Sequence, residues 1–178
     1  MSERLKALEK FRDLVVTEAK ANLQRMGKNS SGKLSNSIKG EVKEMPNSIG
    51  IYFEMEPYGN FQDKGVDGKR VKHGSPYSYK DKMPPPSKLD KWIVRKGIAP
   101  RNNGKFAARS VSAAGFKKSI QFLIARSIYF KGIKPSLFFT KPFEAAYKTL
   151  PDTLIDKYGL DAEKLLTQIL DENLKTKK

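Results

Sequence analysis

The chain has 178 residues, of which 38% are hydrophobic and 30% charged, a composition that suits one globular core. It contains no cysteine and a single histidine, which excludes disulfide scaffolds, thiol catalysis and metal cages of several Cys or His ligands within one subunit. The formal net charge is +16, and the segment 64–118 carries most of it, with 15 lysines and arginines against three aspartates. Such a concentration of positive charge is suited to binding nucleic-acid phosphates or an acidic protein neighbour. The alternative is a solvated basic surface that aids solubility.

The first part of the chain reads as a long helix followed by a hairpin. Apolar residues recur every three or four positions from residue 2 to 26, and Gly27 is expected to end the helix. After a loop at 28–32, residues 33–38 are expected to form one helical turn. Alternation at 38–44 and at 49–55 then predicts two antiparallel strands, with the turn at Pro46 and Asn47.

The middle of the chain alternates short helices with long basic loops. We expect one or two helical turns at 57–65 with Gly65 as the C-cap, and a long exposed loop at 66–86 that ends in three prolines. Ser87 is expected to cap a helix that ends at Gly97, with Leu89, Trp92 and Ile93 facing the core. Residues 99–114 are small, polar and basic without periodicity, which predicts a second mobile loop.

The last third is helical by its periodicity. Residues 116–131 form one helical pattern, whose face contains Phe116, Ile120, Leu123, Ile124 and Ile128. A second pattern runs from 143 to 158 and is interrupted at Pro151, and a final helix from Asp161 is expected to bury Leu165, Ile169 and further leucines. We therefore expect a single domain, 1–178, with a core of about 1–65 and 87–172 and extended loops at 66–86 and 99–114.

Motifs of common enzymes are absent from the sequence. There is no nucleotide-binding glycine loop, HExxH helix or GxSxG elbow, so we expect no enzyme, cofactor or bound metal. Glu41-Val42-Lys43 resembles half of a metal-dependent nuclease site, but no second carboxylate precedes Glu41 back to Glu18. His73 is interpreted as an exposed loop histidine, because a catalytic histidine needs an orienting partner. The charged start and the shortness of the apolar stretch 120–130 predict neither a secretory signal nor a membrane span.

Two sets of residues are candidates for contacts with a partner. Aromatic residues alternate with lysines in the loops, where they either stack on single-stranded bases or serve as anchors buried by a neighbouring subunit; we favour anchors, because no nucleic-acid-binding pattern surrounds them. The candidates for subunit contact are Tyr58, Phe61, Gln62, Tyr77, Tyr79, Pro84, Pro85 and Phe106. The candidates for contact with phosphate or an acidic partner are Lys69, Arg70, Lys72, Arg101, Lys105 and Arg109.

Four stretches in fixed order resemble the tail-completion and minor tail proteins of tailed bacteriophages, also called head–tail joining or neck proteins. They are 31–38 (SGKLSNSI), 58–68 (YGNFQDKGVDG), the three prolines with the helix that ends at 95–98 (RKGI), and 122–143, which contains KGIKP at 131–135 and two phenylalanines at 138–139. Together they cover about residues 30–145. The loop 101–114 and the C-terminal helices extend beyond a minimal member of the family.

This resemblance implies an α+β fold, in which a small antiparallel sheet is packed by the long N-terminal helix and by the helices from Ser87 and Phe116. It implies a non-enzymatic virion protein, assembled in the host cytoplasm into a homo-oligomeric ring between the portal complex and the tail. Its partners would be neighbouring portal, connector and tail proteins, with possible contact to packaged DNA and no membrane. The extended loops suit such a ring, because contacts between subunits would bury them.

Two other functions remain alternatives. A basic nucleic-acid-binding protein predicts tight, salt-dependent binding, and changing Lys69, Arg70 and Lys72 together to Ala should then flatten the salt slope by about three units. A nuclease predicts metal-dependent cleavage that is lost in Glu41→Ala. We rank the virion protein first and the nuclease last.

Overall fold

The computed structural model describes residues 3–45, 48–98, 101–102, 105–106, 113–152, 155 and 162–175. Their contacts divide the chain into two compact units. Unit 1 comprises residues 1–63 and 136–178, and unit 2 comprises residues 64–135. The segments that we expected to form one core therefore fall partly in each unit.

Unit 1 begins with the long helix α1, Glu3–Arg25, as the apolar spacing predicts. Leu8, Phe11, Val15, Ala19 and Leu23 are all buried on one face of the helix. The helix ends at a glycine in the left-handed region, Gly27 with φ 61°, and the next amide, of Lys28, donates to the carbonyl of Leu23 at 3.0 Å. A short helix, α2 (Lys33–Ser37), then leads into the sheet.

The sheet of unit 1 is a two-stranded antiparallel hairpin, made of β1 (Lys39–Met45) and β2 (Ser48–Glu54). Its register pairs Met45 with Ser48 and Lys39 with Glu54. The odd-numbered residues of β2 face the core, whereas Tyr52 and Glu54 face solvent. The strand prediction is confirmed, and the turn residues Pro46 and Asn47 lie outside the described residues.

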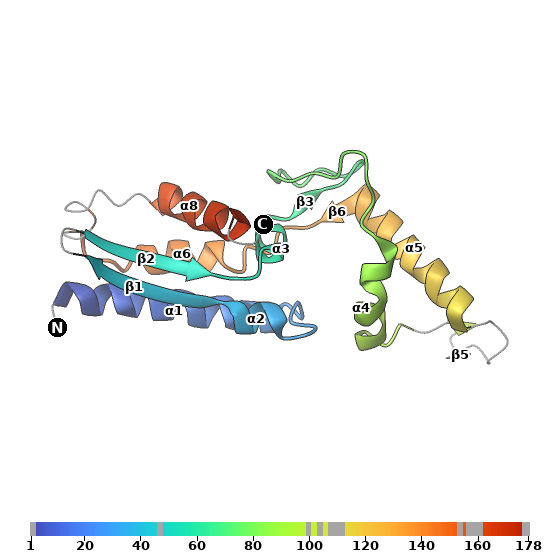
Figure 1. Cartoon of the computed structure of the whole chain (residues 1–178), viewed down its shortest axis with the longest axis horizontal. Coiled ribbons are helices and arrows are strands. Elements are labelled where there is room, and N and C mark those ends of the chain that lie inside the picture. Colours follow the sequence, from blue (N-terminus) through green and yellow to red (C-terminus); the bar gives the residue numbers. More distant parts are fainter. Residues whose placement is uncertain are drawn as a thin grey trace. The chain divides into compact units, whose positions relative to one another are not determined.

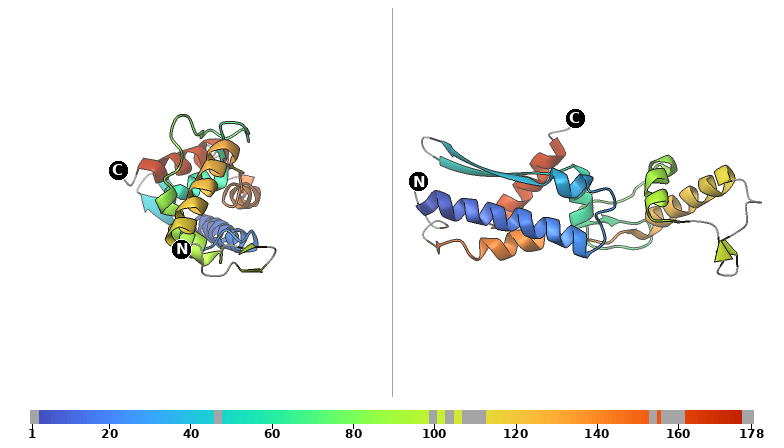
Figure 2. Two further views of the ribbon diagram at one scale, coloured as in Figure 1. Left: turned by 90° about the vertical axis from the view of Figure 1, so that its right-hand side faces the viewer. Right: turned by 90° about the horizontal axis from the view of Figure 1, so that it is seen from below.

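Three helices cover one face of this hairpin. They are α1, α6 (Thr140–Tyr147) and α8 (Ala162–Lys175), and Figures 1 and 2 show them beside the two strands. The core between the layers centres on four phenylalanine rings in edge-to-face or tilted contact, 5.4 to 6.2 Å apart: Phe11, Phe53, Phe139 and Phe143. The predicted α+β class, with a small sheet packed by the N-terminal helix and further helices, is confirmed.

Unit 2 contains short strands and the helix α5 (Ala113–Lys131). The strand β3 (Val66–Asp67) pairs with β6 (Gly132–Ile133), and β4 (Arg101–Asn102) pairs with β5 (Lys105–Phe106). A 3₁₀ turn, η1 (Pro86–Leu89), precedes α4 (Asp90–Arg95), and both pack on α5. Most of the loop expected at 99–114 lies outside the described residues.

Glycines allow β3 and β6 to approach closely. Gly132 has φ 74°, and a Cβ there would collide with the Val66 carbonyl oxygen and the Gly68 nitrogen. At Gly68 a Cβ would collide with the backbone of 130–132. Two of the stretches that carry the family resemblance, 58–68 and 122–143, therefore meet at a crossing where only glycine fits.

Three details of unit 2 differ from the sequence prediction. Ser87 caps no helix, because the prolines first impose a 3₁₀ turn and α4 begins only at Asp90. Trp92 and Leu123 were expected to face a core but are 37% and 56% exposed, because Ile93 and Ala125 are the only apolar residues of these helices, among those whose burial is described, that the small unit buries. The helices that cover the sheet are α1, α6 and α8, whereas α4 and α5 pack on each other.

Candidate functional site

The C-terminal end of α5 is covered by the basic loop that follows β3. The amides of Lys69 and Arg70 donate to the carbonyls of Tyr129 and Phe130, both at 2.9 Å, and the amide of Val71 also donates to Phe130 at 3.2 Å. The Nε2 atom of His73 lies 2.8 Å from the next carbonyl, that of Lys131. The loop thus supplies partners for carbonyls that a helix end leaves unpaired.

Asp67 holds this loop in shape. Its Oδ1 accepts hydrogen bonds from the amides of His73 at 2.7 Å and Ser75 at 3.2 Å, while its backbone pairs with Tyr77 and Tyr79. The hydrogen bond from His73 is the main reason that the pKa of Asp67 lies below its ordinary value. His73 lies in a loop, as predicted, but it is half-buried and has two partners there, the Asp67 carboxylate and the Lys131 carbonyl.

Five basic residues belong to the end of α5 or to the loop that contacts it, and we call them the α5-end cluster. The guanidinium carbon of Arg70 lies 4.6 Å from the centre of the Phe130 ring, and that of Arg126 lies 5.7 Å from it. The ammonium group of Lys69 donates to the carbonyl of Lys80 at 3.0 Å. Lys131 is the last residue of the helix. All five side chains are exposed: Lys69, Arg70, Lys80, Arg126 and Lys131.

The aromatic candidates of this loop are engaged within unit 2. The Tyr79 ring lies 6.3 Å from that of Tyr129, whose hydroxyl donates to the carbonyl of Lys80 at 3.1 Å. Burial raises the pKa of Tyr79. Tyr77 is half-buried, and its carbonyl accepts a hydrogen bond from Asp67 at 2.7 Å. These tyrosines support the loop from inside the unit.

The remaining candidates are spread over both units. Tyr58 and Phe61 lie on α3 (Tyr58–Lys64), 43% and 36% exposed, and Gln62 is half-buried beside them. Pro84 is half-buried and Pro85 is exposed. Lys72 is exposed in the loop 68–80, which follows β3 and covers the end of α5, and which we call the α5 loop. Of Arg101, Lys105 and Phe106 the structure describes the backbone, in β4 and β5. Arg109 lies outside the described residues.

The buried face of α3 is polar, and it fixes the start of α6. Asp63 is fully buried, and its Oδ1 accepts hydrogen bonds from the amides of Phe139 at 2.8 Å and Thr140 at 3.2 Å. Its Oδ2 accepts from the Thr140 hydroxyl. Asp63 therefore acts as a helix cap that comes from a distant part of the chain.

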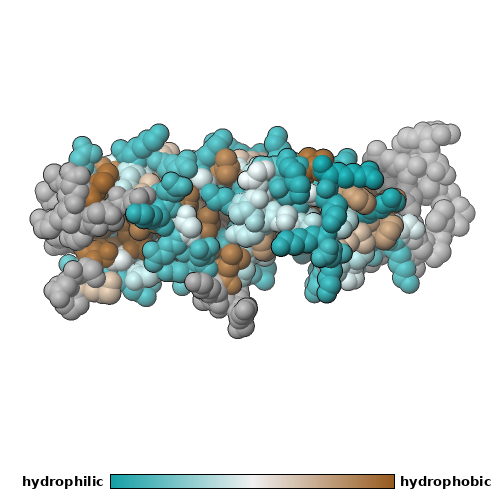
Figure 3. Space-filling view, turned by 90° about the horizontal axis from the view of Figure 1, so that it is seen from above, coloured by the Kyte–Doolittle hydropathy of each residue, from teal (hydrophilic) through white to brown (hydrophobic). Residues whose placement is uncertain are grey.

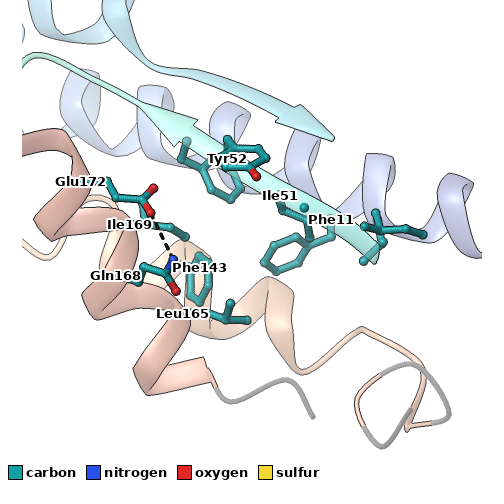
Figure 4. A pocket seen from close by; sticks show the side chains of 12 residues that line it. Phe11, Ile51, Tyr52, Phe143, Leu165, Gln168, Ile169 and Glu172 are labelled. Atoms are coloured by element: carbon teal, nitrogen blue, oxygen red, sulfur yellow. Dashed lines mark hydrogen bonds between the residues drawn. The ribbon is translucent and has the colours of Figure 1, made fainter. Parts of the chain in front are cut away.

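An apolar groove in unit 1 lies between the outer edge of β2 and α8, with a volume of about 160 Å³. Figure 4 shows Ile51 and Phe143 on its walls, with Leu165 and Ile169 contributed by α8. Glu172 and Gln168 bring polar atoms to the same groove, and the Gln168 amide donates to Glu172 at 3.1 Å.

One side chain closes the strand edge at the end of this groove. The amide of Asn173 accepts a hydrogen bond from the Met55 N–H at 2.9 Å and donates to the Phe53 carbonyl at 3.0 Å. Asn173 thus pairs with β2 as a third strand would. Further along the same edge, Ile49 and Ile51 have no backbone partner on this side among the described residues.

Unit 2 exposes large apolar side chains on its two helices. Val94 of α4 is 68% exposed, and Phe122 and Leu123 of α5 are 48% and 56% exposed. Hydrophobic residues also show between hydrophilic ones in the space-filling view of Figure 3. We call Trp92, Val94, Phe122 and Leu123 the α4–α5 apolar residues. Large apolar side chains that stay exposed are typical of surfaces that bind other proteins where they adjoin one another.

The nuclease fragment has a simple structural role. The ammonium group of Lys43 lies 3.2 Å from Glu41 and 5.3 Å from the centre of the Tyr52 ring, on the exposed face of the hairpin.

Within the described ranges no three His, Cys, Asp or Glu side chains come together as metal ligands do. The described helices also include none with the length and apolar character to cross a membrane.

Sequence reasoning found Lys69 and Arg70 but missed the residues that place them. Arg126 and Phe130 are about sixty residues away along the chain and appeared only as members of a helix. Asp67 follows the helix-ending Gly65 by two residues, and aspartate side chains in turns commonly accept hydrogen bonds from nearby backbone amides. No family model, no curated protein and no solved structure matches the chain.

Proposed function

We propose that this chain is a non-enzymatic structural subunit of a tailed phage, of the tail-completion or head–tail connector type, and that it forms a homo-oligomeric ring. The observation that carries the proposal is the set of α4–α5 apolar residues, which a monomer would leave in water. Burying them against a second subunit would remove this apolar surface from solvent.

A ring requires two different surfaces on each subunit, because head-to-tail contacts join one patch to another. Unit 1 offers the apolar groove at the β2 edge, and unit 2 offers the α4–α5 apolar residues. Tyr58 and Phe61 add further exposed aromatic surface to unit 1. These two surfaces support the ring that we propose.

The positions of the resemblance stretches also support this proposal. The glycines at 65, 68 and 132 belong to these stretches, and each lies where a Cβ would meet the backbone of another segment. These stretches therefore hold positions that the fold of unit 2 restricts to glycine. Portal, connector and tail proteins are the partners that we propose, with the virion as the location.

The mass of the purified protein in solution tests the proposal. We expect light scattering to give a defined multiple of the 20.1 kDa chain. Leu123→Asp combined with Phe122→Asp should return the protein to the mass of one chain, because two charges would have to be buried at the interface. A chain that stays monomeric at every concentration would contradict the ring.

Thr17→Asp combined with Gln24→Asp, at two exposed positions of α1, is the matched control, since it adds the same two charges to a helix of unit 1. It should leave the mass of the assembly unchanged. If it dissolves the assembly as well, the association is a general effect of net charge and the α4–α5 apolar residues lose their role.

A further inference from the structure

Nearly all of the net positive charge of this protein lies in one unit. Unit 2 carries 18 lysines and arginines against three aspartates, a net charge of +15. Unit 1 carries 17 basic and 16 acidic residues, a net charge of +1. Three acids cannot neutralise 18 cations, so unit 2 keeps a strong positive field whatever pairs form inside it.

The α5-end cluster concentrates this charge at one place. Arg70 and Arg126 share the ring of Phe130, which holds two like charges near each other. The negative end of the α5 dipole favours cations here. The Asp67 carboxylate of the loop is directed at the amides of His73 and Ser75, and among the described residues neither Arg70 nor Arg126 forms an ion pair. The two guanidinium groups are therefore held in position with their charge available to an anion.

The engaged aromatic rings indicate which kind of anion fits. Base stacking on a single strand needs free ring faces, but Tyr79 and Tyr129 contact each other and Phe130 lies under two guanidinium groups. Guanidinium groups bind phosphate oxygens in pairs, and the surrounding lysines extend the positive surface. Charge of one sign spread over a whole unit suits a long polyanion with regularly spaced charges.

We propose that the α5-end cluster binds the phosphate backbone of duplex DNA without reading its sequence. Arg70, Arg126 and Lys131 make the main phosphate contacts, and Lys69 and Lys80 contribute to the field around them. The binding needs no ring, so this inference stands apart from the proposed assembly, and each can fail alone.

The test measures the affinity for a labelled duplex of arbitrary sequence by fluorescence anisotropy over a range of salt concentrations. We expect the logarithm of the binding constant to fall linearly with the logarithm of salt concentration, by about 0.9 for each phosphate contact. Changing Arg70, Arg126 and Lys131 together to Gln should then reduce the slope by about three units. Absence of duplex binding at low salt would overturn the proposal.

Two control variants separate the site from net charge and from folding. Lys6, Lys10 and Lys141 are exposed residues of unit 1, and their change to Gln removes the same three charges. This variant should keep the wild-type slope. An equal reduction of the slope in both triple variants would overturn the assignment of binding to the α5-end cluster. Arg70→Lys combined with Arg126→Lys keeps the charges and should keep most of the slope.

Two competitors test the choice of ligand. Polyglutamate of matched charge should compete poorly with the duplex, and equal binding of the two would assign the cluster to an acidic protein instead. A single-stranded oligonucleotide should bind no more tightly than the duplex. A clear preference for the single strand would show that bases are stacked and would overturn the duplex proposal.

Discussion

The two units of this protein are stabilised in different ways. Unit 1 packs four phenylalanine rings and 13 further buried apolar residues into one core, whereas only Val66, Ile93 and Ala125 are buried apolar residues among those described in unit 2. Unit 2 is held mainly by backbone hydrogen bonds around Asp67 and the end of α5. The comparison teaches that one unit has the larger share of the buried core, while the other exposes charge and apolar side chains at its surface.

The largest expected effect contrasts two phenylalanines. Phe143 is 1% exposed in unit 1, so Phe143→Ala should lower the free energy of unfolding by about 3–5 kcal/mol through lost burial and a cavity. Phe122 is 48% exposed in unit 2, and Phe122→Ala should cost less than about 1 kcal/mol while weakening assembly. Urea denaturation of dilute protein measures both. Equal costs would mean that unit 2 depends on its apolar residues as much as unit 1 does.

The second effect concerns the buried cap Asp63. Asp63→Ala should destabilise unit 1 by about 3 kcal/mol, because the amides of Phe139 and Thr140 and the Thr140 hydroxyl lose their acceptor inside the core. Asp13→Ala is the control, since Asp13 pairs with Arg12 on the exposed side of α1 and should change stability by less than about 1 kcal/mol. Thermal unfolding that is the same for both variants would rule out the capping role.

The third effect tests whether unit 2 opens separately. Gly132→Ala should cost about 2 kcal/mol or more, because the left-handed backbone and the Val66 carbonyl both oppose a Cβ. Gly74→Ala has a similar φ of 71° but open space around it, and it should cost only about 1 kcal/mol. Amide hydrogen exchange should accelerate at Lys69 and Arg70 but stay unchanged in unit 1. Acceleration in both units would show that they unfold as one body.

The smallest effect is the pH dependence of the α5 loop. The pKa of Asp67 is lower in the folded protein than the ordinary value of 3.8, so the unfolded chain binds the proton more readily. The contribution of this carboxylate is therefore complete above the ordinary value and is lost as the pH falls through the lowered pKa. In Asp67→Asn, exchange at the His73 and Ser75 amides should lose this acid dependence. An NMR titration that places the Asp67 pKa at or above 3.8 would contradict the prediction.

Much of the fold followed from periodicity. The helices α1, α5 and α8 and the hairpin were predicted because their apolar spacing is local, and Gly27, Gly65 and Gly97 marked helix ends that have positive φ in the structure. Periodicity alone cannot decide whether a stripe finds a partner. Leu123 lies on a good helical face but remains exposed, since unit 2 has too few elements to cover it.

The polar side chains that fix the elements of unit 1 to one another could not be predicted. Asp63 and Asn173 are hydrophilic by composition, and their partners lie 76 to 120 residues away in the chain. The α5-end cluster was predicted in part, because Lys69 and Arg70 stand in a basic loop. Arg126 joins them only through the folding of that loop onto the helix end, and no local pattern indicates such a contact.

The position of Trp92 gives this protein a built-in optical probe. It is the only tryptophan of the chain and lies on α4 in unit 2. Fluorescence excited at the red edge of protein absorption therefore comes from unit 2 alone. The wavelength of its emission maximum reports how much water reaches the Trp92 side chain, which is 37% exposed. The burial of α4 by another molecule can thus be followed in the native chain, without a label.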